Sequence, residues 1–251
     1  MSRSQKIGQR TLQAGRLGFS LIEMVIALSI LIIVLAVAVE GIAQMVRRST
    51  AESSKIDTVQ QMRDFVDQMV RDVHGVGFPP GRVVNGNPTC VNNANLSCGL
   101  IYFSSTQIRY EGDLDGTGTV YQVWMQLQVP ASGNCPCVLQ RGVVSKAAAL
   151  AGQVPTYFTE VNGVLNSGNG AGTGTYPIVL QGGGDYTSYA TADVFDAYDV
   201  NTSAVGTCTD PVACSSIRSL QITANIIPAF LDPKTNLYTV YSVTSKARLN
   251  N

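Results

Sequence analysis

The stretch Arg16-Leu17-Gly18-Phe19-Ser20-Leu21-Ile22-Glu23 begins an apolar run that continues to Val39. From Phe19 to Val39 the run contains 21 residues, and Glu23 is its only charged residue. At about 1.5 Å per residue, a helix of this length is about 31 Å long, which is enough to cross the hydrocarbon core of a bilayer. The sequence therefore predicts a membrane-spanning helix near the N-terminal end of the chain.

Basic residues in front of this run predict its orientation. Residues 1–18 contain no acidic residue and four basic ones, Arg3, Lys6, Arg10 and Arg16. Two basic residues, Arg47 and Arg48, follow on the far side. Because positive charge is retained in the cytoplasm, we expect a single-pass membrane protein with a cytoplasmic N-terminus and the bulk of the chain on the other side of the membrane.

The basic segment, then Gly18, Phe19 and a glutamate at the fifth place after the glycine, resembles the N-terminal signal of the type IV prepilins. A prepilin peptidase is then expected to cut after Gly18 and to methylate the new N-terminus at Phe19. The resemblance implies a location in the bacterial inner membrane and then in a periplasmic or cell-surface filament. It also implies that Glu23 meets the N-terminal amine of a neighbouring pilin or pseudopilin subunit. A carboxylate in hydrocarbon costs roughly 2.5–3.5 kcal/mol, and pairing with an amine offsets that cost and favours one axial register.

Two other interpretations of the same run stay open. One is a plain membrane anchor that contains a glutamate. The other is an ordinary secretory signal with the small residues Ala36-Val37-Ala38 as its cleavage site, which would release a free secreted domain starting at Val39. The apolar stretch before Ala36 is longer than the roughly 7–15 residues usual in such signals and contains Glu23, so the sequence favours the prepilin interpretation.

The helical pattern continues beyond the apolar run. Residues 47–73 contain no proline or glycine, and apolar residues recur at alternating steps of three and four: Val59, Met62, Val66, Met69 and Val73. Charged residues occupy the rest of the helical wheel: Asp57, Arg63, Asp64, Asp67 and Asp72. Gly75, Gly77 and the Pro79-Pro80 pair end the pattern. We therefore expect one long helix whose second half packs on a globular head through a single apolar stripe.

Alternating apolar and polar residues after Leu100 predict β-strands. The clearest run is Val120–Val129, which faces Gln107–Glu111 across a turn rich in Asp and Gly. Two later runs alternate in the same way, at Leu220, Ile222, Ala224 and Ile226 and at Leu237, Thr239, Tyr241 and Val243. The predicted fold class is α+β, with the long helix packed on an antiparallel sheet. The expected parts are a leader (1–18), a membrane or filament-core helix (19–39), its amphipathic continuation (40–75) and a β-rich head (76–251).

Features of the predicted head make the resemblance more specific. The helix end Arg71-Asp72-Val73-His74-Gly75-Val76-Gly77-Phe78, the hairpin at Asp113-Leu114-Asp115-Gly116 and the chain ending resemble the larger minor pilins of the PilW type. The J-type pseudopilins of type II secretion are similar in layout. The resemblance implies the type IV pilin fold and a structural role in the assembly, initiation or tip of a filament. A membrane-anchored or secreted binding module, dependent on calcium, is the competing function.

The Asp113-Leu114-Asp115-Gly116-Thr117-Gly118 loop is the candidate metal site, and the candidate cation is calcium. It is no EF-hand, since position twelve counted from Asp113 is Trp124. Glu111 and backbone carbonyls are the further oxygen donors of a looser site. The simpler interpretation is that Asp and Gly residues form a tight hairpin turn.

All six cysteines follow the predicted membrane helix, in a compartment where disulfides form. Six cysteines allow 15 pairings. Short loops favour Cys90–Cys98 and Cys208–Cys214, which leaves Cys135 with Cys137. Redox chemistry at the last pair and zinc binding by reduced cysteines are the less favoured alternatives.

The remaining features argue against catalysis and nucleic-acid binding. His74 is the only histidine and no Gly-x-Ser-x-Gly motif accompanies it, so no catalytic residue and no required cofactor is predicted. The alternating glycines from Gly168 to Gly174 precede Pro177 rather than a helix pattern and are expected to form a surface loop. Without the leader the chain has 13 basic and 17 acidic residues, a net charge of −4, which provides no basic surface for nucleic acid.

Overall fold

The computed structural model describes residues 19–79, 83–84, 87–131, 133–166, 180 and 183–249. The leader with Gly18 lies outside these residues, as does the Gly168–Gly174 loop. The chain divides into two compact units, residues 1–46 and residues 47–251.

Helix α1 (Leu21–His74) belongs to both units. In the first unit, the apolar side chains from Phe19 to Val39 are exposed, because no other described part of the chain packs around them. Among the described residues, α1 is the one helix long and apolar enough to cross a membrane. The structure is therefore compatible with a single-pass anchor.

In the second unit, α1 packs on the sheet through the predicted stripe, except that Val59, its first residue, is only half-buried and lies outside the core. Met62, Val66, Met69 and Val73 are buried, and Phe65 joins them. The helix ends at His74, where Gly75 donates a hydrogen bond back to the carbonyl of Asp72 and Gly77 adopts a φ of 83°. One residue of the polar side differs from the prediction: Asp72 is buried, because it pairs with an arginine of the sheet.

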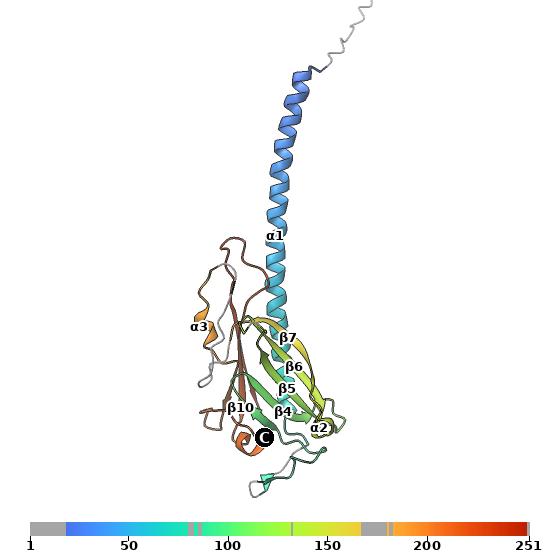
Figure 1. Cartoon of the computed structure of the whole chain (residues 1–251), viewed down its shortest axis with the longest axis vertical. Helices are drawn as coiled ribbons and strands as arrows, with labels where there is room; N and C mark the ends of the chain where they lie inside the picture. Colours follow the sequence, from blue (N-terminus) through green and yellow to red (C-terminus); the bar gives the residue numbers. More distant parts are fainter. Residues whose placement is uncertain are drawn as a thin grey trace, which may run out of the picture. The chain divides into compact units, whose positions relative to one another are not determined.

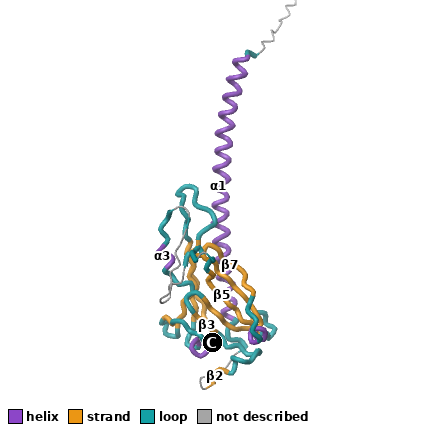
Figure 2. Tube along the Cα trace, viewed as in Figure 1, coloured by secondary structure: helices purple, strands orange, loops and turns teal. Residues whose placement is uncertain are grey.

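Nine of the described strands form one antiparallel sheet (Figures 1 and 2). Their order is β3-β4-β5-β6-β7-β10-β8-β9, and β11 pairs with β10. The bounds are β3 Leu100–Phe103, β4 Gln107–Asp113, β5 Val120–Gln128, β6 Cys137–Ser145, β7 Thr156–Val164, β8 Phe195–Tyr198, β9 Ala204–Val205, β10 Ser219–Ile226 and β11 Tyr241–Arg248. The predicted α+β class is thus observed, as a long helix on an antiparallel sheet.

Five short elements complete the described structure. Two are the strands β1 (Val83–Val84) and β2 (Asn87–Pro88), which pair with each other. The others are the helices α2 (Lys146–Leu150), α3 (Thr187–Ala190) and α4 (Pro211–Cys214). Ser145 caps α2 and Asp210 caps α4 through side-chain oxygens that accept backbone N–H groups.

The last predicted strand is wrong at its start. Alternation suggested a strand from Leu237, but β11 begins at Tyr241. The carbonyl of Leu237 accepts a hydrogen bond from Asp232, and Asn236 has a φ of 57°. Leu237 therefore closes a turn, and its carbonyl is not available to the sheet ladder.

The sheet has a helix-facing side and an outer side. Ile108, Val123 and Met125 are completely buried against α1. Their sequence neighbours Arg109 and Trp124 are only partly buried and lie on the outer side. This alternation places polar and aromatic side chains of β4 and β5 on the surface opposite the helix.

Candidate functional site

Of the predicted processing and assembly residues, the structure describes Phe19, which precedes α1, and Glu23, which lies in its first turn. Phe19 is 83 % exposed. The carboxylate of Glu23 accepts a hydrogen bond from the backbone N–H of Ser20, at 3.1 Å between N and Oε2. This is half of a capping box, in which an acid at the third helical position satisfies a free N–H at the helix start. Glu23 is thus held at the end of the helix and directed back toward Phe19.

The Asp113 loop is organised by its own backbone. The Asp113 carboxylate accepts hydrogen bonds from the N–H groups of Gly116 (2.9 Å) and Gly118 (2.8 Å), and more weakly from Asp115 (3.3 Å). Gly116 and Gly118 have φ values of 70° and 85°, which suit glycine. These contacts form the tight hairpin turn that was the simpler interpretation of the motif.

Asp115 is also occupied within the loop. Its carboxylate accepts the Thr117 hydroxyl (2.7 Å) and the Tyr121 hydroxyl (3.1 Å). The hydrogen bond from Thr117 lowers the pKa of Asp115, and the nearby carboxylate raises the pKa of Tyr121. Among the described residues, no three His, Cys, Asp or Glu side chains gather as a metal would require. Calcium binding at Asp113 and Asp115 stays a prediction.

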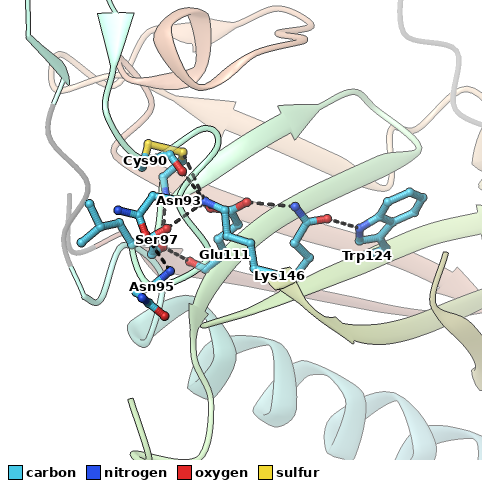
Figure 3. A network of polar contacts seen from close by, with 11 residues as sticks. Cys90, Asn93, Asn95, Ser97, Glu111, Trp124 and Lys146 are labelled. Carbon is cyan, nitrogen blue, oxygen red and sulfur yellow. Dashed lines mark hydrogen bonds and ion pairs between the residues drawn. A yellow bond between two sulfur atoms is a disulfide. The ribbon is translucent and has the colours of Figure 1, made fainter. Parts of the chain in front are cut away.

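Glu111, which the sequence suggested as a further calcium ligand, has another role. Its carboxylate pairs with Lys146 at 2.6 Å, and both side chains are almost completely buried (Figure 3). The same Oε2 atom accepts the backbone N–H of Cys98. Glu111 therefore faces the 90–98 loop, away from the carboxylates of the hairpin turn.

Lys146 lies at the centre of this network. Its ammonium group donates to the carbonyls of Cys90 (2.7 Å) and Leu96 (2.8 Å) as well as to Glu111, so its three donor hydrogens are used. On the far side of Glu111, the amide of Gln122 donates to Oε1 at 2.9 Å, and Gln122 accepts the indole N–H of Trp124 at 3.3 Å. Figure 3 shows this chain of contacts from the disulfide loop to the indole. No local pattern predicted it, because Lys146-Ala147-Ala148-Ala149 resembles an exposed helix.

A second buried ion pair joins α1 to the sheet. Arg141 of β6 donates from Nε (2.9 Å) and from a terminal nitrogen (2.7 Å) to one oxygen of Asp72. The hydroxyl of Tyr110 donates to the same oxygen, and Gln68 donates to the other. Burial, followed by the charge of Asp72, raises the pKa of Tyr110 well above its usual value. This cluster holds the end of the helix against the strands.

The six cysteines form three disulfides, which are the pairs with the shortest connecting loops: Cys90–Cys98, Cys135–Cys137 and Cys208–Cys214. All six cysteines of the chain lie in the described residues, and none is left as a thiol. With every thiol oxidised, zinc has no cysteine ligand in this structure. The Cys208–Cys214 pair encloses the start of α4, and Cys208 bonds through its backbone to Phe103 of β3. This disulfide therefore ties its loop to the edge of the sheet.

A groove of about 590 Å³ lies beside the head portion of α1. Its lining includes Ser54, Asp57 and Thr58 of the helix and Phe230 and Tyr238 of the segment between β10 and β11. Phe230 is 52 % exposed there. His74, by contrast, is exposed at the end of α1 and does not line this groove.

Comparison with known proteins adds no relative: no protein-family model, curated protein or solved structure matches this chain. The functional assignment thus depends on the residues and contacts of the chain itself.

Proposed function

We propose that this chain is a prepilin whose mature form is a minor structural subunit of a type IV pilus, of the PilW type, acting in filament assembly, initiation or at the tip. The observation that carries the proposal is the Gly18-Phe19 junction followed by Glu23, at the start of one continuous helix that ends in the head domain.

The exposure of the first half of α1 supports a filament role. Its apolar side chains have no partner among the described residues of the chain, so lipid or the helices of other subunits must cover them. A lipid anchor alone needs no acid in its first turn. In this proposal the Glu23 carboxylate, in the first turn of α1, binds the N-terminal amine of a neighbouring subunit.

The second half of α1 attaches the head to the helix and lies beside a surface that a neighbouring subunit can contact. It is bound to the sheet by the buried stripe and by the Asp72–Arg141 pair. The groove at Ser54, Asp57 and Phe230 leaves a partly apolar surface next to the helix, which suits contact with a neighbouring head. The size of the disulfide-bonded head favours a minor subunit over one repeated along the whole fibre.

The same features suit a J-type minor pseudopilin of type II secretion. Deletion of the gene distinguishes the pilus assignment from the secretion assignment. Loss of surface pili supports the first, and loss of protein secretion with intact pili supports the second.

Processing is the first test of the proposal. The protein is purified from its native membranes, and its intact mass and N-terminal sequence are determined. A chain that begins at methylated Phe19 supports the proposal. A chain that begins at Val39 identifies an ordinary signal peptide and overturns it.

Glu23 provides the second test. Glu23→Gln keeps the size of the side chain and removes its charge, so it should enter the membrane normally and be depleted from sheared filaments. Glu40→Gln is the matched control, since Glu40 is an exposed acid farther along the same helix. Equal incorporation of the Glu23 variant and wild type would show that the pairing role is wrong.

A further inference from the structure

The outer side of the sheet carries a row of aromatic side chains that the filament role does not use. The strand registers place Tyr102 (β3) opposite Arg109 (β4), Arg109 opposite Trp124 (β5), Trp124 opposite Gly142 (β6) and Gly142 opposite Tyr157 (β7). One line of side chains therefore crosses five neighbouring strands, over about 19 Å at about 4.8 Å per strand.

The members of this row are in contact with one another. The guanidinium carbon of Arg109 lies 3.8 Å from the ring centre of Trp124 and 5.0 Å from that of Tyr102. The rings of Trp124 and Tyr157 meet edge to face, with centroids 6.5 Å apart, above the position where Gly142 has no side chain. Each side chain is only partly buried. The row is thus an ordered, solvent-accessible platform.

The platform is fixed from one side. The indole N–H of Trp124 donates to Gln122, Gln122 donates to Glu111, and Glu111 accepts from the completely buried Lys146 (Figure 3). Gly142 leaves room for the side chain of Pro155, since a Cβ at position 142 would lie 2.9 Å from the Pro155 Cβ. Aromatic groups held in one orientation bind a ligand without the entropic cost of ordering them.

A second row beside the first consists of hydrogen-bonding side chains. Gln107, Gln126, Gln140 and Thr159 lie opposite one another on β4, β5, β6 and β7. Gln107 donates to Gln126 at 3.1 Å and accepts from Arg109 at 3.2 Å, so the two rows are connected. Amides and hydroxyls both donate and accept hydrogen bonds.

The charges of the residues in the two rows restrict the class of ligand that can bind there. Of the nine described positions in the two rows, Arg109 alone is charged, and its guanidinium stacks between two rings. A nucleic acid requires several basic side chains along its backbone. A neutral ligand with many hydroxyl groups and apolar C–H faces matches instead, because its C–H groups pack on the aromatic surface that Arg109 leaves uncovered and its hydroxyls meet the amides.

We propose that the outer face of β3–β7 is a binding site for an extended neutral glycan, with Trp124 and Tyr157 as the stacking surface and Gln126 and Gln140 as the flanking hydrogen-bonding groups. This site is independent of the filament role, since it lies on the face of the sheet opposite α1.

Trp124 is the only tryptophan of the chain, so intrinsic fluorescence reports on this site directly. The full chain is purified in a zwitterionic detergent, because glucoside and maltoside detergents are themselves sugars. The probes are hexasaccharides of β-1,4-linked glucose, β-1,4-linked N-acetylglucosamine and α-1,4-linked glucose, with a single-stranded oligothymidylate for comparison. At least one hexasaccharide should give a saturable change in emission.

Two neighbouring residues provide the matched variants. Tyr157→Ala should weaken glycan binding about tenfold, the loss expected for one stacking contact. Phe158→Ala should leave binding unchanged, because Phe158 is 67 % exposed but lies opposite Arg141 on the helix-facing side. Unchanged emission with every hexasaccharide overturns the proposal. So does a response to oligothymidylate alone, or an equal loss in both variants.

Discussion

The two halves of helix α1 have opposite relations to the rest of the chain. In the first, Leu31 and its apolar neighbours are exposed, whereas in the second Met62 is completely buried against the sheet. The first half is predominantly apolar and the second is amphipathic, and only the second contributes to the core of the described chain. The described head is therefore stabilised internally, and the first half adds nothing to that core.

The largest expected effect is confined to the head. Lys146→Met leaves the buried Glu111 carboxylate without its cation and should lower the free energy of unfolding by roughly 3–5 kcal/mol. Denaturant unfolding followed by Trp124 fluorescence measures this loss. Lys234→Met, at an exposed lysine, should change it by less than about 0.5 kcal/mol. A stable Lys146 variant would show that the ion pair does not hold the head together.

The direct test of the contrast between the halves is one large-to-small substitution in each. Met62→Ala opens a cavity between α1 and the sheet and should cost about 2–5 kcal/mol in unfolding of the head. Leu31→Ala should leave the same unfolding curve unchanged, because the Leu31 side chain is exposed. Equal losses in the two variants would contradict the division of the helix.

The pH dependence of the stability of the head tests the contribution of the buried Tyr110. Burial raises the pKa of its hydroxyl in the folded head, so the unfolded chain loses that proton first as pH rises. The contribution of the protonated Tyr110 hydroxyl to stability is fully present below the ordinary tyrosine pKa of about 10 and is lost as the pH rises above it. Tyr110→Phe should cost about 1.5–3 kcal/mol at neutral pH, where the bond to Asp72 is lost.

Unfolding at about pH 8 and again above about pH 10 measures both parts of this prediction. The alkaline decline should be shallower in Tyr110→Phe than in wild type. Parallel declines in the two proteins would show that another group causes the loss.

The smallest effect concerns the hairpin turn. Thr117→Val removes the hydroxyl that holds the pKa of Asp115 low, so that pKa should rise toward its ordinary value. A lowered pKa in the folded protein stabilises the fold above the unfolded pKa, and this stability is lost as pH falls through the folded pKa. The variant should therefore be less stable than wild type at neutral pH and should lose less stability on acidification. Carboxyl NMR titration measures the change. An unaltered Asp115 titration would exclude Thr117 as its cause.

Patterns along one segment were predictable because they depend only on neighbours in sequence. The spacing of Met62, Val66, Met69 and Val73 identified the packed stripe, and alternation identified most of β5 and β10. One failure lies in a local turn before β11, and the others lie where distant segments meet. Asp72 was assigned to the polar side of the helix, but Arg141 of β6 accommodates it in the interior.

Local composition and periodicity were enough to predict the apolar run with its one acid, the long helix and the antiparallel strands. The candidate processing residues came from the resemblance to the prepilins and stay a prediction. They could not predict that Lys146 is buried with Glu111, or that Tyr102, Arg109, Trp124 and Tyr157 form one row. Those arrangements depend on strand register, which no local pattern encodes. Register brings together residues as much as 55 positions apart in the chain, from Tyr102 to Tyr157, and so the tertiary structure was needed to find them.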